Sequence, residues 1–156
     1  MTYRNTQNPY LVNVALRALG GAIRDLGRPT GTVRETGPYG SESRFEYSTQ
    51  SPAERLEVTE DLIGAAFVLA QTYIRIAKKP NSPTVANVLH VANYWKHRDT
   101  WDTNWMPGRM KMEKDTISGV RALGAAPPVT LGQLTKLAET VLDGGFDVEM
   151  LWAKIS

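Results

Sequence analysis

The stretch SPAERLEVTEDLIGAAFVLAQTYIRIAKKP, residues 51–80, carries the clearest structural pattern in the chain. Ser51, Pro52 and Glu54 form a helix-start signature: the serine caps the helix, the proline takes its first position and the glutamate closes a capping box. The apolar residues that follow share one broad helical face: Leu56, Leu62, Ile63, Ala66, Phe67, Ala70, Tyr73, Ile74 and Ala77. Two lysines and a proline end the pattern. Such a helix is expected at the centre of a helical bundle.

A second amphipathic helix is predicted upstream, from Pro9 to Gly27. Its apolar residues again recur at three- and four-residue steps: Leu11, Val14, Ala15, Ala18, Leu19, Ala22, Ile23 and Leu26. Gly20 and Gly21 lie inside this helix, where a glycine costs about 1 kcal/mol relative to alanine. Their presence predicts a close crossing with another helix.

Residues 28–50, RPTGTVRETGPYGSESRFEYSTQ, separate these two helices and have a different character. Turn-forming residues dominate, and strand-like alternation is confined to TVRET and RFEYS on either side of GPYG, which predicts a small β-hairpin or a mobile loop. A connection of this length is often functional or disordered. Its cationic and aromatic side chains offer contacts to an acidic or nucleic-acid partner, although a solvated loop is the simpler interpretation. They are Arg28, Arg34, Arg44, Tyr39, Phe45 and Tyr47.

The rest of the chain also has helical periodicity. Ser82 and Pro83 repeat the helix-start signal, and the third helix runs into NVLHVANYWKHRDTWDTNW, residues 87–105, whose second half is rich in turn formers. Fourth, fifth and sixth helices are predicted from Met110, from a capping box at Thr130 and Gln133, and from Asp147. The predicted fold is all-α, a bundle of five or six helices with a non-helical insertion at about 28–50.

The composition sets limits on the class of protein. A length of 156 residues fits a single helical domain over residues 1–156. The absence of cysteine excludes disulfides, thiolate zinc sites and thiol nucleophiles, and suits a reducing compartment. The longest apolar run, Leu62 to Ala70, is far shorter than the roughly 20 residues of a membrane span. We therefore expect a cytoplasmic protein without a membrane partner, and the net charge of +2 does not indicate nucleic acid by itself.

The third helix carries a polar strip, because His90, Asn93 and His97 fall on one face. Asn93 and His97 are spaced to hydrogen-bond each other, and such a pair can bind a phosphate or move a proton near neutral pH. They are the candidate catalytic residues. The alternative, which we favour, is structural: the asparagine satisfies a buried carbonyl and His97 is a solvated residue at the helix end.

Other common chemistries find little support in the sequence. His90 and His97 lie two helical turns apart with no carboxylate placed as in a zincin helix, so no metal site is predicted. Nucleophile-elbow, P-loop and dinucleotide fingerprints are absent from the sequence, and no cofactor is expected. Aromatic rings beside cations can stack on bases, but they more often anchor an irregular segment or fill an interface. The candidate binding residues are His90, Lys96, Arg98, Trp101, Trp105 and Arg109.

The segment VANYWKHRDTW resembles the HEPN superfamily, all-α domains of bacterial defence and toxin–antitoxin systems. Many members are metal-independent ribonucleases that act as dimers, with a motif of an arginine, a polar residue, three further residues and a histidine. Asn93 and His97 match this motif, and Lys96 and Arg98 supply the basic surround, but Ala92 occupies the arginine position. The resemblance implies a domain that has lost the cation that stabilises charge on the cleaved phosphate.

These patterns predict a non-catalytic helical interaction or accessory module, a degenerate HEPN-like domain that forms a homo-oligomer or binds a partner protein. Its expected contact surfaces are residues 94–105, which are rich in aromatic side chains, and the 28–50 insertion. The alternative is a metal-independent ribonuclease or RNA-binding protein that acts through the polar strip and its basic neighbours. A small-molecule enzyme with a pocket between helices is a third hypothesis without a motif behind it.

Overall fold

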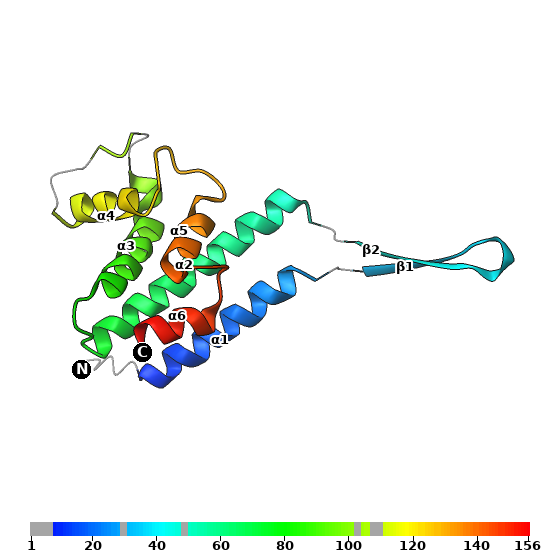
Figure 1. Cartoon of the computed structure of the whole chain (residues 1–156), viewed down its shortest axis with the longest axis horizontal. Helices are drawn as coiled ribbons and strands as arrows, with labels where there is room; N and C mark the ends of the chain where they lie inside the picture. Colours follow the sequence, from blue (N-terminus) through cyan, green and yellow to red (C-terminus); the bar gives the residue numbers. More distant parts are fainter. Residues whose placement is uncertain (1–7, 29–30, 48–49, 102–103, 107–110) are drawn as a thin grey trace, which may run out of the picture.

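The computed structural model describes residues 8–28, 31–47, 50–101, 104–106 and 111–156. Within these ranges the chain is mostly helical, with six α-helices and one two-stranded antiparallel sheet (Figure 1). The elements are α1 (Pro9–Leu26), β1 (Gly31–Thr36), β2 (Glu42–Tyr47), α2 (Pro52–Ile76), α3 (Pro83–His97), α4 (Lys111–Ala122), α5 (Gln133–Leu142) and α6 (Val148–Ile155), with short 3-10 turns η1 (Pro38–Gly40) and η2 (Arg98–Thr100). The predicted helical chain with a β-hairpin insertion is confirmed.

Helix α2 lies at the centre of the helical part and packs against α1, α3, α5 and α6. The capping box predicted at its start is confirmed, since the Ser51 hydroxyl accepts from the Glu54 amide at 3.2 Å and the Glu54 carboxylate accepts from the Ser51 amide at 2.8 Å. The cap predicted at Ser82 is formed as well, and Asp147, where the sixth helix was predicted to begin, caps α6. Local sequence signals therefore set where α2, α3 and α6 begin.

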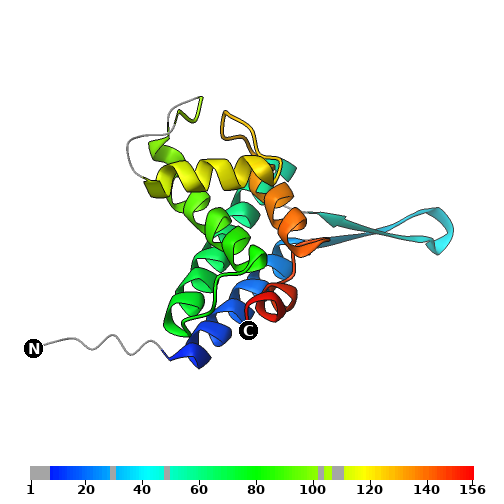
Figure 2. The same cartoon turned by 60° about the vertical axis from the view of Figure 1, so that its left-hand side comes forward.

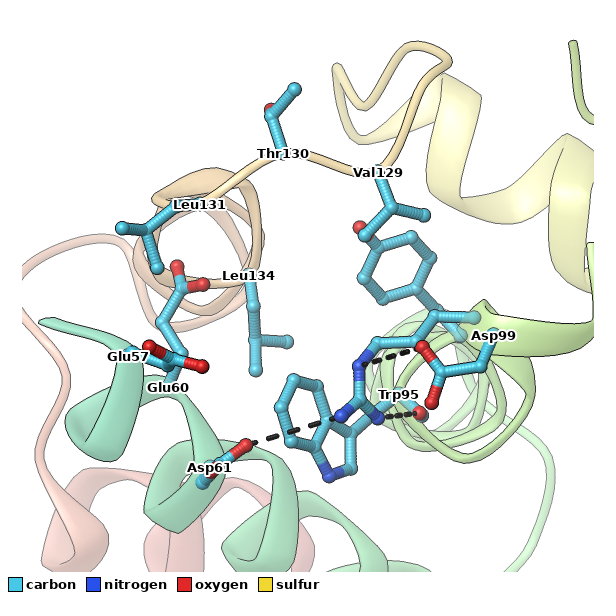
Figure 3. A pocket seen from close by; sticks show the side chains of 11 residues that line it. Glu57, Glu60, Asp61, Trp95, Asp99, Val129, Thr130, Leu131 and Leu134 are labelled. Atoms are coloured by element: carbon cyan, nitrogen blue, oxygen red, sulfur yellow. Dashed lines mark hydrogen bonds and ion pairs between the residues drawn. The ribbon is translucent and has the colours of Figure 1, made fainter. Parts of the chain in front are cut away.

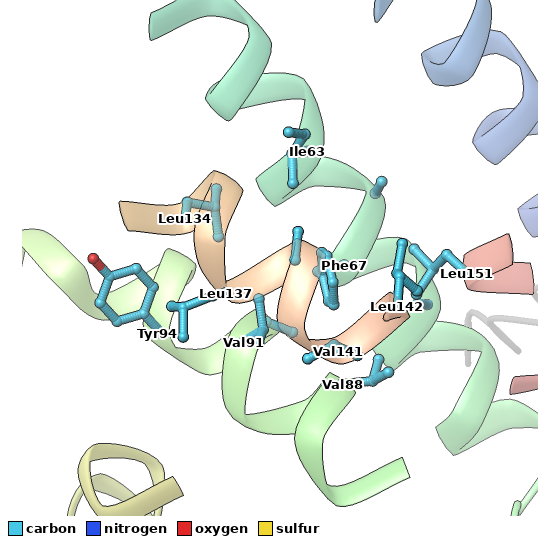
Figure 4. Close-up of a cluster of buried hydrophobic side chains, with 14 of the residues drawn as sticks. Ile63, Phe67, Val88, Val91, Tyr94, Leu134, Leu137, Val141, Leu142 and Leu151 are labelled. Atoms are coloured by element: carbon cyan, nitrogen blue, oxygen red, sulfur yellow. The ribbon is translucent and has the colours of Figure 1, made fainter. Parts of the chain in front are cut away.

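The hydrophobic core is formed where α2, α3, α5 and α6 meet (Figure 4). Phe67 of α2 is fully buried and lies among aliphatic side chains from the other three helices. The largest of these buried side chains are Val88, Val91, Leu134, Leu137 and Leu151. Burying each such side chain stabilises the fold by about 1.5–3 kcal/mol, so this cluster dominates the packing energy.

Helix α1 packs on α2 and α6. A Cβ atom at Gly20 would collide with the side chain of Val148 on α6, so the glycine permits the close helix crossing that the sequence predicted. A Cβ atom at Gly21 would have no atom of the described chain within 4 Å. Only the first of the two interior glycines is therefore required by packing.

The two strands form a hairpin, here called the β-arm (residues 31–47), that stands clear of the helices in both views (Figures 1 and 2). Its register pairs Val33 with Phe45 and Arg34 with Arg44. Every strand residue whose exposure the structure describes is exposed, apart from the partly covered Gly31. The arm joins α1 to α2 in sequence but adds nothing to their core.

No helix in the described ranges combines the length and the hydropathy that crossing a membrane requires.

Candidate functional site

The polar strip of α3 faces α4. His90 and Asn93 line a groove of about 890 Å³ that runs between these helices, while His97 lines an adjoining cavity of about 150 Å³ beside the N-terminal turns of α4. The two helices approach closely at Gly119 of α4, where the absence of a side chain makes room for the His90 ring; a Cβ atom there would collide with it. The structure thus places the three residues on one helix face, as the sequence predicted, but divides them between two cavities.

Asn93 takes part in a hydrogen-bond chain with α2. Its Oδ1 accepts from Nε2 of the buried Gln71 at 2.9 Å, and Oε1 of the same glutamine accepts from Nζ of Lys96 at 2.6 Å. Between Asn93 and His97, both of which the structure describes, there is no hydrogen bond. The asparagine therefore satisfies a buried side-chain N–H group rather than the buried carbonyl expected from the sequence, and it does not orient His97.

His90 is half-buried, and its pKa is lowered from 6.5, chiefly because burial disfavours the charged ring and despite the opposing attraction of Asp115 on α4. The ring therefore stays neutral at physiological pH more readily than a solvated histidine would. A neutral imidazole beside a carboxylate can accept a proton.

We expect His90 to contribute to the pH dependence of stability. Because its folded pKa lies below its unfolded value, its contribution is complete above about pH 6.5 and is lost as pH falls through the folded pKa. Between about pH 7.5 and 5.5 the free energy of unfolding should fall less in His90→Gln than in the wild type. Urea unfolding across this range measures the slope, and NMR titration of the His90 imidazole protons measures its midpoint. A His90 midpoint at or above 6.5 would contradict the expectation.

Arg98 does not converge with the polar strip. Its guanidinium lies 3.3 Å from the centre of the Trp95 ring and donates to the Trp95 carbonyl at 2.5 Å. Ion pairs of 3.9 Å to Asp61 and Asp99 complete its surroundings (Figure 3). The side chain therefore lines a different cavity, of about 450 Å³, between α2, α3 and the segment before α5. The basic cluster expected around His97 is divided between faces of α3.

The cavity beside Arg98 contains a buried carboxylate, Glu60. Glu60 of α2 is 6% exposed, and its Oε1 accepts from the backbone N–H and the hydroxyl of Thr135 at 3.0 and 2.9 Å. Thr135 lies in the first turn of α5, so Glu60 caps that helix from a neighbouring one. Its role is accounted for by these bonds.

This arrangement overturns the capping box predicted at Thr130 and Gln133. Helix α5 begins at Gln133 after Gly132, whose φ of 93° suits glycine and which has no side chain to cap the helix. The Gln133 side chain is used elsewhere: it accepts from the Ala126 amide at 3.1 Å and donates to the Tyr94 hydroxyl at 2.8 Å. The local pattern misplaced the cap because the acceptor comes from a distant helix.

The tryptophans pack with one another. Tyr94, Trp101 and Trp105 form a cluster of three edge-to-face contacts with ring centroids 5.4 to 5.8 Å apart. Trp105 is 1% exposed, so its ring is enclosed by the protein rather than presented for stacking, and Trp101 is partly covered. These contacts favour the anchoring role over base or partner binding. Arg109, the remaining candidate binding residue, lies outside the described residues.

The β-arm carries the most exposed aromatic side chain of the structure's described part and two further exposed apolar side chains. Tyr39 at its tip, Phe45 and Val33 are 107%, 53% and 44% exposed. The alternation of TVRET and RFEYS predicted this hairpin, but it did not reveal that the hairpin leaves the helices altogether. Among the described residues no group of three or more histidine, aspartate or glutamate side chains is arranged to hold a metal ion.

Comparison with known proteins adds no assignment. No family model matches the chain, and no significant match to it is found among curated proteins or among solved structures. The resemblance to HEPN domains therefore stays a prediction from the sequence.

Proposed function

We propose that this chain is a non-catalytic interaction module, a six-helix bundle that binds protein through its β-arm. The observation that carries the proposal is an amphipathic hairpin without support from the chain's own core. Isolated two-stranded hairpins are marginally stable in water, and their outer edges and apolar faces are open to another chain. A partner that covers the arm provides the burial that the helices do not.

The two faces of the β-arm differ in chemistry. Strand alternation places Val33 and Phe45 on one face as a cross-strand pair, together with Glu35 and Ser43. The opposite face is entirely polar and consists of Thr32, Arg34, Thr36, Glu42, Arg44 and Glu46. A solvated loop does not require apolar and polar side chains to lie on opposite faces. At a protein interface the apolar face is the one that contacts the partner.

The charge of the β-arm favours protein over nucleic acid. Residues 31–47 contain two arginines and three glutamates, which gives a net charge of −1. Nucleic-acid affinity depends on lysine and arginine side chains that neutralise phosphates, and a weakly acidic arm lacks that driving force. The hydrogen bonds of Asn93 and Lys96 and the stacking of Arg98 give these candidates structural roles, which supports a non-catalytic module.

Replacing residues 31–47 by a short Gly-Ser turn should abolish protein association while the helices keep their circular dichroism and melting temperature. Light scattering and affinity capture from extracts of the encoding cells measure association. The point variant Val33→Ser, Phe45→Ser should reproduce the loss, and Thr32→Ser, Thr36→Ser on the polar face serves as a matched control. Association that survives removal of the arm, or a wild type that binds neither itself nor another protein, would count against the proposal.

A second candidate is RNA binding or metal-independent RNA cleavage in the groove between α3 and α4. The observation in its favour is that His90, Asn93 and Lys111 line the same open groove, beside the segment that resembles HEPN domains. The proposal predicts RNA binding that weakens steeply with salt, or cleavage without metal. Either property is lost in His90→Ala, whose ring lines the groove, or in His97→Ala, which removes the motif histidine from the adjoining cavity. RNA behaviour unchanged in both variants would contradict it.

A further inference from the structure

We propose that the β-arm of one copy docks in an apolar groove between α1 and α2 of a second copy, with Glu35 placed against Lys96. This inference rests on the proposed function and names its partner. The groove has a volume of about 580 Å³ and is lined by small and aliphatic side chains, among them Ala15 and Ala18 of α1 and Val68 and Leu69 of α2. Trp95 and Lys96 of α3 also line it.

The groove continues into an exposed apolar stripe on α1. Leu11 and Val14 are 60% and 46% exposed and share the helix face of Ala15 and Ala18. From Leu11 to Ala22 this stripe spans about 17 Å at the rise of an α-helix. A six-residue strand such as β1 or β2 spans about 20 Å, so the arm and the stripe match in length.

The polar part of the groove is cationic. Lys96 donates to Gln71 but forms no ion pair with any carboxylate that the structure describes, and the same holds for Arg75. Burial first, and the charge of Arg75 second, lower the pKa of Lys96. A carboxylate beside the ammonium group opposes both effects, because an opposite charge favours the charged form of the lysine. An apolar ligand with one acidic side chain is therefore the best fit.

The apolar face of the β-arm has this composition. It offers Val33 and Phe45 to the apolar lining and carries Glu35 two residues further along the same face. Direct contact between the grooves of two copies would be repulsive, because Lys96 would face Lys96. The acidic β-arm, by contrast, is complementary in charge to the basic groove. In both views the arm points away from the helices of its own chain, so an arm from another copy is the one that fills the groove (Figure 2). Depending on the rotation between copies, such contacts close a ring or dimer, or propagate as a filament.

Cysteine crosslinking tests this contact directly, because the chain has no cysteine of its own. Ala18→Cys protein mixed with an affinity-tagged Ser43→Cys protein should form a disulfide-linked pair of one tagged and one untagged chain under mild oxidation, because Ser43 lies on the face of Val33 and Phe45 and its replacement leaves both in place. Thr32→Cys, on the polar face of the arm, is the matched control and should crosslink at least tenfold more slowly. Equal rates for Ser43→Cys and Thr32→Cys would overturn the proposal.

Charge reversal tests the pairing of Glu35 with Lys96. Glu35→Lys and Lys96→Glu should each weaken self-association by tenfold or more in Kd, and an equimolar mixture of the two variants should regain affinity. Lys114→Glu, at an exposed position on α4, is the charge-matched control and should leave self-association unchanged. Both single variants retaining wild-type affinity would overturn the proposal, as would failure of the mixture to recover any affinity.

The same samples separate this inference from the proposed function. If the arm still captures a different protein but Ser43→Cys gives no specific crosslink to Ala18→Cys, the second copy is the wrong partner and the interaction module stands. If removal of the arm changes neither the capture of other proteins nor the mass of the assembly in light scattering, both proposals fail. Specific crosslinking together with recovery in the charge-reversed mixture would support both.

Discussion

Replacing Gly64 with valine should lower the free energy of unfolding by about 3 kcal/mol. Gly64 lies in the middle of α2 and is buried, and a Cβ built on it collides with the indole of Trp95 on α3. That indole cannot simply rotate away, since its ring is also stacked by the guanidinium of Arg98 at 3.3 Å. The helices must separate or the indole must leave its site, and either change disrupts packing along α2 and α3.

The control for this prediction is a glycine without a neighbour. Gly21→Ala in α1 meets no described atom within 4 Å, so only helix propensity changes and stability should rise by about 1 kcal/mol. Chemical denaturation followed by tryptophan fluorescence measures both variants. If Gly64→Val proves as stable as the wild type, α2 and α3 do not cross as closely as the structure has them.

Glu60→Ala should destabilise the fold by about 2–3 kcal/mol. The change removes the acceptor for the Thr135 amide and hydroxyl, which are partly buried and then lack an acceptor from the described chain. It also removes negative charge from the N-terminus of α5, where the helix dipole favours it. Because Gly132 has no side chain to cap the helix, Glu60 is the side-chain acceptor that the described structure provides for this turn.

Glu57→Ala is the matched control, because Glu57 stands three residues earlier on α2 and is exposed. We expect it to change the free energy of unfolding by less than about 0.5 kcal/mol. The free energy of unfolding of Glu60→Gln should lie between those of Glu60→Ala and Glu57→Ala, since an amide oxygen still accepts a hydrogen bond but brings no charge. Urea unfolding with hydrogen exchange at the α5 amides reads out both global and local loss. Equal stability of Glu60→Ala and Glu57→Ala would contradict the capping role.

The functional candidates were harder to predict than the helices. His97 and Arg98 are adjacent in sequence, yet they line cavities on different sides of α3, because successive helical residues point about 100° apart. Trp105 looked available from composition, but its burial depends on the rings of Tyr94 and Trp101. Aromatic and cationic residue types identify a candidate surface, whereas the direction of each side chain decides whether it belongs to one.

The sequence by itself determined the features that arise from neighbouring residues: the capped start of α2, its broad apolar face, and the hairpin pattern at 28–50. Helix caps and hydrophobic periodicity depend on residues a few positions apart, so they can be recognised in the sequence without knowledge of the fold. Only the tertiary structure decided that Glu60 caps α5, that Trp95 packs on Gly64, and that the β-arm leaves the helices. Each depends on which distant element lies opposite a residue, and that is set by how the apolar faces pack together.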